Sequence, residues 1–205
     1  IQYENLTHPE LQDLFSLRRE VFKNRLNWNV IVRKGLESEE YDNRYASYIF
    51  GKVGDVLVCS VMFITSKSKT MISGVFHKHF SGLNLPKGQY LEASRLFVDK
   101  KTTRSLNIHN QPLSALLFLS IINYSKINGY SNVYAVVSLE VFLVFKRTGW
   151  MIEMVSEGVS QQAEKILFIS MPTNDENQSI MIAKIKAHTE FKFENLKSWP
   201  LLWNV

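Results

Sequence analysis

The stretch that decides the fold reads Tyr90-Leu91-Glu92-Ala93-Ser94-Arg95-Leu96-Phe97-Val98-Asp99-Lys100. It is apolar enough to predict a buried strand, yet it carries Glu92 and Arg95. An unpaired buried charge is costly, so such groups are usually paired, hydrogen-bonded or used in chemistry. Glu92 and Arg95 are therefore the first candidates for a site, and a structural ion pair is the alternative interpretation.

The segments around this strand alternate between strand and helix patterns. Strands are predicted at 45–50, 56–64, 91–98, 133–137 and 165–171. Helices are predicted at 10–26, 113–128, 139–146 and 179–188. The order strand, helix, strand, helix, strand implies parallel pairing in part of the sheet. The sequence therefore predicts an α/β sandwich.

Composition limits the class of protein. The 205 residues fit one domain, 1–205, and 45% hydrophobic with 21% charged residues exclude a disordered or fibrous chain. A lone cysteine, Cys59, forms neither an internal disulfide nor a multi-cysteine metal site, which favours a reducing compartment and the cytoplasm. The five histidines show no ligand pattern, so no metal is expected. No apolar run is long enough to span a membrane.

The net charge of +5 favours an acidic partner. Nucleic acid is the default partner for such a chain, but the basic residues are scattered and form no recognition motif. An acidic protein explains the charge equally well. We therefore expect neither nucleic acid nor a membrane as a partner.

Five motifs, spread in order from Leu17 to Trp150, resemble those of one family. They are Leu-Arg-x-x-x-Phe-x-x-Arg-Leu-x-Trp at 17–28, the acidic motif at 37–42, Cys59-Ser60-Val61, Glu92-x-Ser94-Arg95-x-Phe97-Val98, and the stretch from Val137-Ser138 to Gly149-Trp150. Together they resemble the LuxI-type acyl-homoserine lactone synthases, the autoinducer synthases of bacterial quorum sensing. The resemblance implies a GNAT-like acyltransferase fold, a central twisted mixed sheet with helices on both faces and a V-shaped opening between central strands.

The resemblance also implies a two-step reaction. An acyl chain passes from acyl carrier protein to the amine of S-adenosylmethionine, and the methionine carboxylate then closes the lactone and expels methylthioadenosine. S-adenosylmethionine is a substrate in this scheme, so no cofactor is expected. Acyl transfer needs a deprotonated amine, a polarised thioester carbonyl and aligned reactants.

Three residues of the central strand match catalytic positions of the family. Glu92 matches the general base, acting directly or through water. Arg95 would orient Glu92 and help to hold substrate, but strand alternation places residues three apart on opposite faces unless a bulge intervenes. Ser94 would hydrogen-bond substrate, or serve as a small core residue.

The family's N-terminal positions imply an ordered cap, at about 10–44, over the S-adenosylmethionine site. They fall on Arg18, Phe22, Trp28, Glu39 and Asp42. Trp28 offers an aromatic face to adenine or to the sulfonium. Glu39 and Asp42 would neutralise Arg18 and attract the cationic substrate. Without the resemblance, the aromatic residues read as core and the acids as a solvated turn.

Two positions depart from the family pattern. Met62 stands where the resemblance leads us to expect arginine, and Glu39 stands where it leads us to expect aspartate. A cation missing from a charged cluster leaves carboxylates under-compensated. The absence should raise their pKa values or loosen the cap.

Acyl and carrier contacts also follow from the resemblance. The acyl pocket is expected to be lined by Phe97, Phe118, Ile121, Ala135, Val137 and Leu143, all of which also read as core. Ala135 lacks the hydroxyl that accompanies 3-oxo chains in the family, which favours an unsubstituted acyl group. An acidic carrier protein is expected to contact Lys100, Lys101, Arg104, Lys146 and Arg147.

Two other functions remain open on the sequence. An N-acyltransferase that uses acyl-coenzyme A would need a glycine-rich pyrophosphate cradle after the central strand, and residues 99–110 contain no glycine. A non-catalytic or weakened module that binds an acyl or adenosyl ligand is favoured by Met62.

Overall fold

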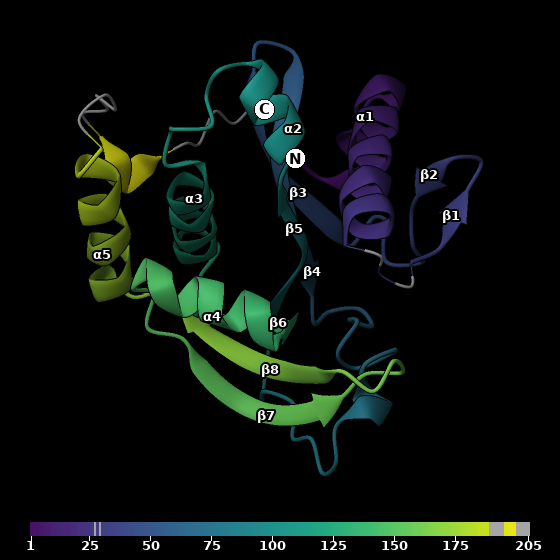
Figure 1. Cartoon of the computed structure of the whole chain (residues 1–205). Coiled ribbons are helices and arrows are strands. Elements are labelled where there is room, and N and C mark those ends of the chain that lie inside the picture. Colours follow the sequence, from purple (N-terminus) through teal and green to yellow (C-terminus); the bar gives the residue numbers. More distant parts are fainter. Residues whose placement is uncertain (27, 29, 189–194, 200–205) are drawn as a thin grey trace.

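A six-stranded mixed sheet forms the centre of the computed structural model, which describes residues 1–26, 28, 30–188 and 195–199 (Figure 1). The spatial order is β3-β4-β5-β6-β8-β7, and the β5–β6 pair is parallel whereas the other pairs are antiparallel. The strands are β3 (Ala46–Val53), β4 (Val56–Thr65), β5 (Leu91–Val98), β6 (Asn132–Ser138), β7 (Glu153–Val159) and β8 (Lys165–Pro172).

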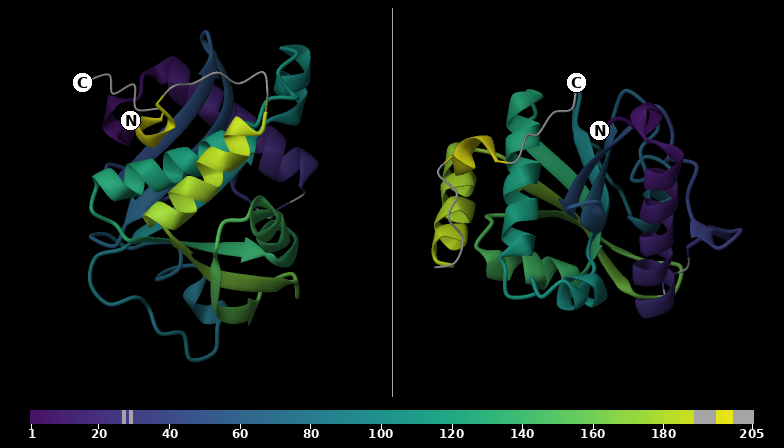
Figure 2. Two further views of the ribbon diagram at one scale, coloured as in Figure 1. Left: turned by 90° about the vertical axis from the view of Figure 1, so that its left-hand side faces the viewer. Right: turned by 90° about the horizontal axis from the view of Figure 1, so that it is seen from above.

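Helices cover both faces of this sheet. Figure 2 shows α3 and α5 side by side on one face and α1 on the other. The helices are α1 (His8–Arg18), α2 (Lys100–Ser105), α3 (Leu113–Ile127), α4 (Leu139–Thr148) and α5 (Asp175–Lys186). Because both faces are covered, β4 is buried along nearly its whole length. The predicted mixed sheet with helices on both faces is confirmed.

Short elements complete the fold. They are the 3₁₀ turns η1 (Tyr3–Asn5), η3 (His77–His79) and η4 (Leu196–Ser198), the π-helix η2 (Arg19–Arg25), and the hairpin of β1 (Val32–Arg33) and β2 (Leu36–Glu37). Within the described chain no helix combines the length and apolarity that a membrane span requires.

The predicted helix at 10–26 is two elements. A capping box between Thr7 and Glu10 starts α1, with Pro9 in its first turn. After Arg18 the helix widens into η2, where the Leu26 amide donates to the Val21 carbonyl. The two elements carry Arg18 and Phe22 into the core on the α1 side of the sheet.

The parallel pair at the centre of the sheet opens into a V. Pairing joins Leu91 to Val133 and Glu92 to Tyr134, and it does not continue along the remainder of these two described strands. The strands therefore separate beyond Glu92. This geometry confirms the predicted V-shaped opening and places Glu92 at its base.

A bulge in β5 changes the direction of its side chains. Ser60 pairs with Phe97 and Met62 with Ser94, so Arg95 and one further β5 residue stand opposite Val61. Ser94 and Phe97 consequently share the α1 face although they are three positions apart. Arg95 has φ of +50°, which a residue with a side chain rarely adopts and which costs about 1–3 kcal/mol.

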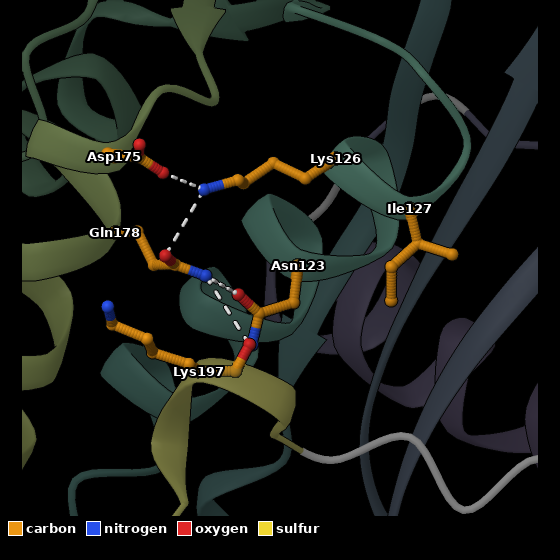
Figure 3. A pocket seen from close by; sticks show the side chains of 6 residues that line it. All are labelled: Asn123, Lys126, Ile127, Asp175, Gln178 and Lys197. Carbon is orange, nitrogen blue, oxygen red and sulfur yellow. Dashed lines mark hydrogen bonds and ion pairs between the residues drawn. The ribbon is translucent and has the colours of Figure 1, made fainter.

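Polar side chains connect α3 and α5. A hollow of about 360 Å³ lies between α3 and α5. Figure 3 shows that Gln178 bonds there to Asn123 and to Lys126. Lys126 also pairs with Asp175, and Asn123 donates to the Leu196 carbonyl. These groups therefore bind one another across α3, α5 and η4.

Candidate active site

A cleft of about 660 Å³ lies beside the opening of the sheet. One wall comes from the predicted cap, whose residues 27 and 29 lie outside the described chain. The other walls come from the segment 71–79, the end of β6 and the β7–β8 turn. Among the predicted site residues, Trp28, Glu39, Arg95 and Val137 line this cleft.

Glu92 is not among the residues that line the cleft, and 1% of its surface is exposed. The Ile72 amide donates to its carboxylate at 3.0 Å. Burial raises the pKa of Glu92 to about 7, although the Ile72 and Met71 amides and the Thr70 hydroxyl oppose that rise. A carboxyl poised near neutral pH suits a general base.

The two arginines that the sequence offered as partners of Glu92 bind other carboxylates. Arg18 donates to Asp42 at 2.6 Å and also pairs with Glu37. Arg95 donates to Glu37 at 3.0 Å and also pairs with Glu39. Within the described chain neither arginine pairs with Glu92. The ion-pair interpretation of Glu92 is thus wrong, and so is the prediction that Arg95 orients it.

Glu37 is the residue that sequence reasoning missed. Glu37 is fully buried and accepts hydrogen bonds from both arginines. Tyr48, on β3, donates to Asp42 at 2.6 Å. The one feature of the sequence that could have identified Glu37 was its place in the acidic motif, two residues before Glu39. The cluster retains two cations for three carboxylates, with Glu37 in the place predicted for Glu92.

The pKa values of the two arginines in this cluster shift in opposite directions. Burial and the nearby charge of Arg18 lower the pKa of Arg95 to about 10. Burial also acts to lower the pKa of Arg18, but the attraction of Asp42 and Glu37 is stronger, so the pKa of Arg18 is raised. Nη2 of Arg18 has no hydrogen-bond partner among the described residues. The cluster is therefore tightly paired but incompletely satisfied.

Met62 lies beside this cluster without joining it chemically. It is 1% exposed and stands opposite Tyr48 on one side and Ser94 on the other. The Ser94 hydroxyl donates to the Met71 sulfur at 3.1 Å. A thioether at position 62 fills the space and adds no positive charge.

An aromatic stack links the cluster to the cleft. The Phe22 and Trp28 rings lie 5.0 Å apart, and Phe97 meets Phe22 edge to face at 6.2 Å. The Arg95 guanidinium lies 5.5 Å from the centre of the Phe22 ring. Phe22 and Phe97 are buried, so Trp28 is the member of this stack that faces the cleft.

The predicted acyl residues do not form one group. Phe118, Ile121, Ala135 and Val137 belong to the core on the α3 side of the sheet. Phe97 packs with Phe22 on the opposite side, because the β5 bulge turned it there. Leu143 is 45% exposed on α4. The predictions that Phe97 and Leu143 join the other four in one acyl pocket are therefore wrong.

Across the described residues, no three His, Cys, Asp or Glu side chains are placed to hold a metal ion.

Comparisons with known proteins give the class of this fold and site. An "Autoinducer synthase" family model matches residues 2–181. An acyl-homoserine-lactone synthase of Serratia liquefaciens is 43% identical over 189 residues, 92% of this chain and 94% of that protein. Another from Pectobacterium carotovorum subsp. carotovorum is 40% identical over 201 residues, 98% and 93% of the two chains.

A solved structure shares the fold. The CoA-dependent acyl-homoserine lactone synthase BjaI, solved with SAM and isopentyl-CoA, matches with a TM-score of 0.75 and 17% identity over 91% of this chain and 87% of that one. The fold and the sequence matches thus define an acyltransferase. The chain belongs to the autoinducer synthase family, and its function is that of an acyl-homoserine-lactone synthase.

Proposed function

We propose that this enzyme transfers an acyl chain from acyl carrier protein to the amine of S-adenosylmethionine and then closes the lactone, releasing methylthioadenosine. The observation that carries the proposal is Glu92, a buried carboxyl with a pKa of about 7 that accepts a hydrogen bond from an amide of the segment 71–79, part of which lines the cleft. BjaI, whose solved complex contains SAM, supports S-adenosylmethionine as substrate. That substrate is consumed, so the scheme needs no cofactor.

In the first step, Glu92 takes a proton from the substrate ammonium. The free amine attacks the thioester carbonyl, an amide bond forms, and the carrier thiol leaves with a proton. The cap supports binding of a cation because its cluster holds three carboxylates for two arginines. Trp28 offers its ring to the adenine or the sulfonium.

In the second step, the substrate carboxylate attacks its own γ-carbon. A carbon–oxygen bond forms, the carbon–sulfur bond breaks, and the sulfur keeps the electron pair as neutral methylthioadenosine. The sulfonium is already a good leaving group, so the protein mainly has to hold the substrate folded. The product is a quorum-sensing signal.

Carrier protein is favoured as donor by the helices that flank the V. β5 leads into α2 and β6 leads into α4, so these helices follow the two diverging strands (Figure 1). Their predicted carrier contacts are exposed, at Lys100, Lys101, Arg104, Lys146 and Arg147. Basic groups on both sides of the opening suit an acidic protein that inserts a thioester arm.

Coenzyme A is disfavoured by the start of α2. The Asp99 carboxylate accepts from the Thr102 amide at 2.9 Å and from the Lys101 amide at 3.4 Å. It thereby occupies the amides that a pyrophosphate would need and adds negative charge there. BjaI is CoA-dependent, so the donor must be tested directly.

The test is methylthioadenosine release from S-adenosylmethionine with either acyl carrier protein thioester or acyl-coenzyme A. We expect release with the carrier donor and a fall in rate as salt rises, because the attraction between basic and acidic proteins is screened. Equal or better rates with acyl-coenzyme A at all salt concentrations would contradict the carrier proposal. Binding without release would favour the non-catalytic module.

The scheme includes a cytoplasmic location, which the buried free Cys59 supports.

A further inference from the structure

Gly158 on β7 permits a close contact with the end of the segment 70–80. A methyl group on Gly158 would lie 2.3 Å from the His79 carbonyl oxygen and 2.8 Å from the Phe80 ring. Phe80 forms an isolated antiparallel bridge with Gly158, and the His79 ring donates to the Val159 carbonyl at 2.9 Å. Glycine at 158 therefore lets this segment rest against the edge strand of the sheet.

The other end of the same segment holds the carboxyl of Glu92. The Ile72 amide donates to Glu92 at 3.0 Å, and Ile72 is fully buried. Backbone hydrogen bonds link the two ends in successive turns, from the amide of Gly74 to the carbonyl of Thr70, from His77 to Gly74 and from Phe80 to His77. A displacement at the β7 end is therefore transmitted toward Glu92.

An apolar cluster joins the segment to the strands next to Gly158. Its buried members are Ile72, Phe80, Tyr90, Ile166 and Phe168. The Phe80 ring lies edge to face with Phe168 at 6.4 Å, and Ile166 pairs with Gly158 between β8 and β7. The contact at Gly158 and the covering of Glu92 thus belong to one packed unit.

We propose that Gly158 is a positioning residue that lets the segment 70–80 close over Glu92 and keep water from its carboxyl. This inference rests on the proposed function, in which Glu92 is the base. A side chain at position 158 would push the His79 backbone away from β7, and the part of the segment that covers Glu92 would move with it. Water would then replace the Ile72 amide as donor and hydrate the carboxyl.

The test is Gly158→Ala, which adds only the methyl group that would meet the His79 carbonyl. The titration of Glu92 is followed by carbon-13 NMR of its carboxyl, assigned by the signal that Glu92→Gln lacks. We expect its pKa to fall from about 7 by about one pH unit or more, because burial is the main cause of the raised value. Methylthioadenosine release should fall about 10-fold, since a weaker base takes up the substrate proton less effectively.

Other ionisable groups around Glu92 do not obscure this titration. Burial raises the pKa values of Tyr41 and Tyr90 above the ordinary 10, and the charge of Glu92 adds to both rises, so neither ionises near pH 7. Tyr134 pairs with Glu92 from β6. The segment itself adds three ionisable side chains that are exposed or half-buried, namely His77, Lys78 and His79. The carboxyl signal distinguishes Glu92 from all of them.

The matched control is Gly51→Ala. A methyl group on Gly51 would likewise lie 2.3 Å from a neighbouring atom, the sulfur of Cys59. Cys59 lies toward the opposite end of β4 from Ile64, the residue that pairs with Glu92. This control should lower the melting temperature, as Gly158→Ala does, and leave the pKa of Glu92 at its wild-type value.

A pKa of Glu92 that is unchanged or higher in Gly158→Ala overturns the inference. If Gly158→Ala does not fold, Phe80→Leu, which removes the ring contact with Phe168, replaces it and is judged by the same measurement. Turnover that Glu92→Gln leaves near normal overturns the proposed function instead, because Glu92 would then not be the base.

Discussion

Glu92→Gln should separate catalysis from stability in this enzyme. Glutamine fills the same volume, keeps a carbonyl oxygen for the Ile72 amide and cannot take a proton from the substrate. We expect methylthioadenosine release to fall by about 100-fold or more, the usual scale for a general base. The fold should remain intact, because the variant resembles the protonated, uncharged form of the wild-type residue.

The structure also sets the size of the stability change. The pKa of Glu92 is raised from the ordinary 4.5 to about 7, mainly by burial. Each pKa unit corresponds to about 1.4 kcal/mol, so ionising the buried group costs the folded state about 3 kcal/mol. A group whose folded pKa is raised contributes stability below its unfolded pKa and loses it as pH rises through the folded value. Wild-type stability should thus decline from about pH 4.5 to about pH 7.

Glu92→Gln should remove that decline. Relative to wild type, the variant should gain about 2–3 kcal/mol between pH 5 and pH 8, or about 5–10 °C in melting temperature for a chain of this size. Thermal unfolding of both proteins at the two pH values measures it, and methylthioadenosine release measures activity. Near-normal turnover would refute Glu92 as base, and parallel pH profiles would refute its raised pKa.

Three further predictions concern the charges of the site. Wild-type turnover should rise through about pH 7 as Glu92 loses its proton, and a profile flat from pH 6 to 8 would argue against this base. Met62→Arg adds a third cation and should raise S-adenosylmethionine affinity or turnover in a binding and rate assay; a fall in both activity and melting temperature would exclude position 62 from the cluster. Glu37→Gln should destabilise the protein by about 3–5 kcal/mol in denaturant unfolding, because it unpairs two buried arginines. Its control, Glu157→Gln, breaks the exposed pair with Lys165 and should change stability little, and equal losses would deny the buried cluster its role.

Local patterns determined much of this protein. Apolar runs and helical spacing predicted an α/β sandwich, because periodicity reflects which side chains each element buries, and the family resemblance implied the mixed sheet with helices on both faces. A charged pair inside the apolar run at 91–98 pointed to Glu92, and the acidic motif pointed to a partner for Arg18. These features are readable because each depends on residues that are close in the chain.

Tertiary structure alone decided which charges meet. The bulge at Arg95 arises from the register between β4 and β5, and it turned Phe97 toward the cap and Arg95 toward Glu37. Burial raised the pKa of Glu92 even though the segment 70–72 donates hydrogen bonds to its carboxylate. Strand register, desolvation and the satisfaction of buried polar groups depend on residues far apart in sequence, so no local pattern could report them.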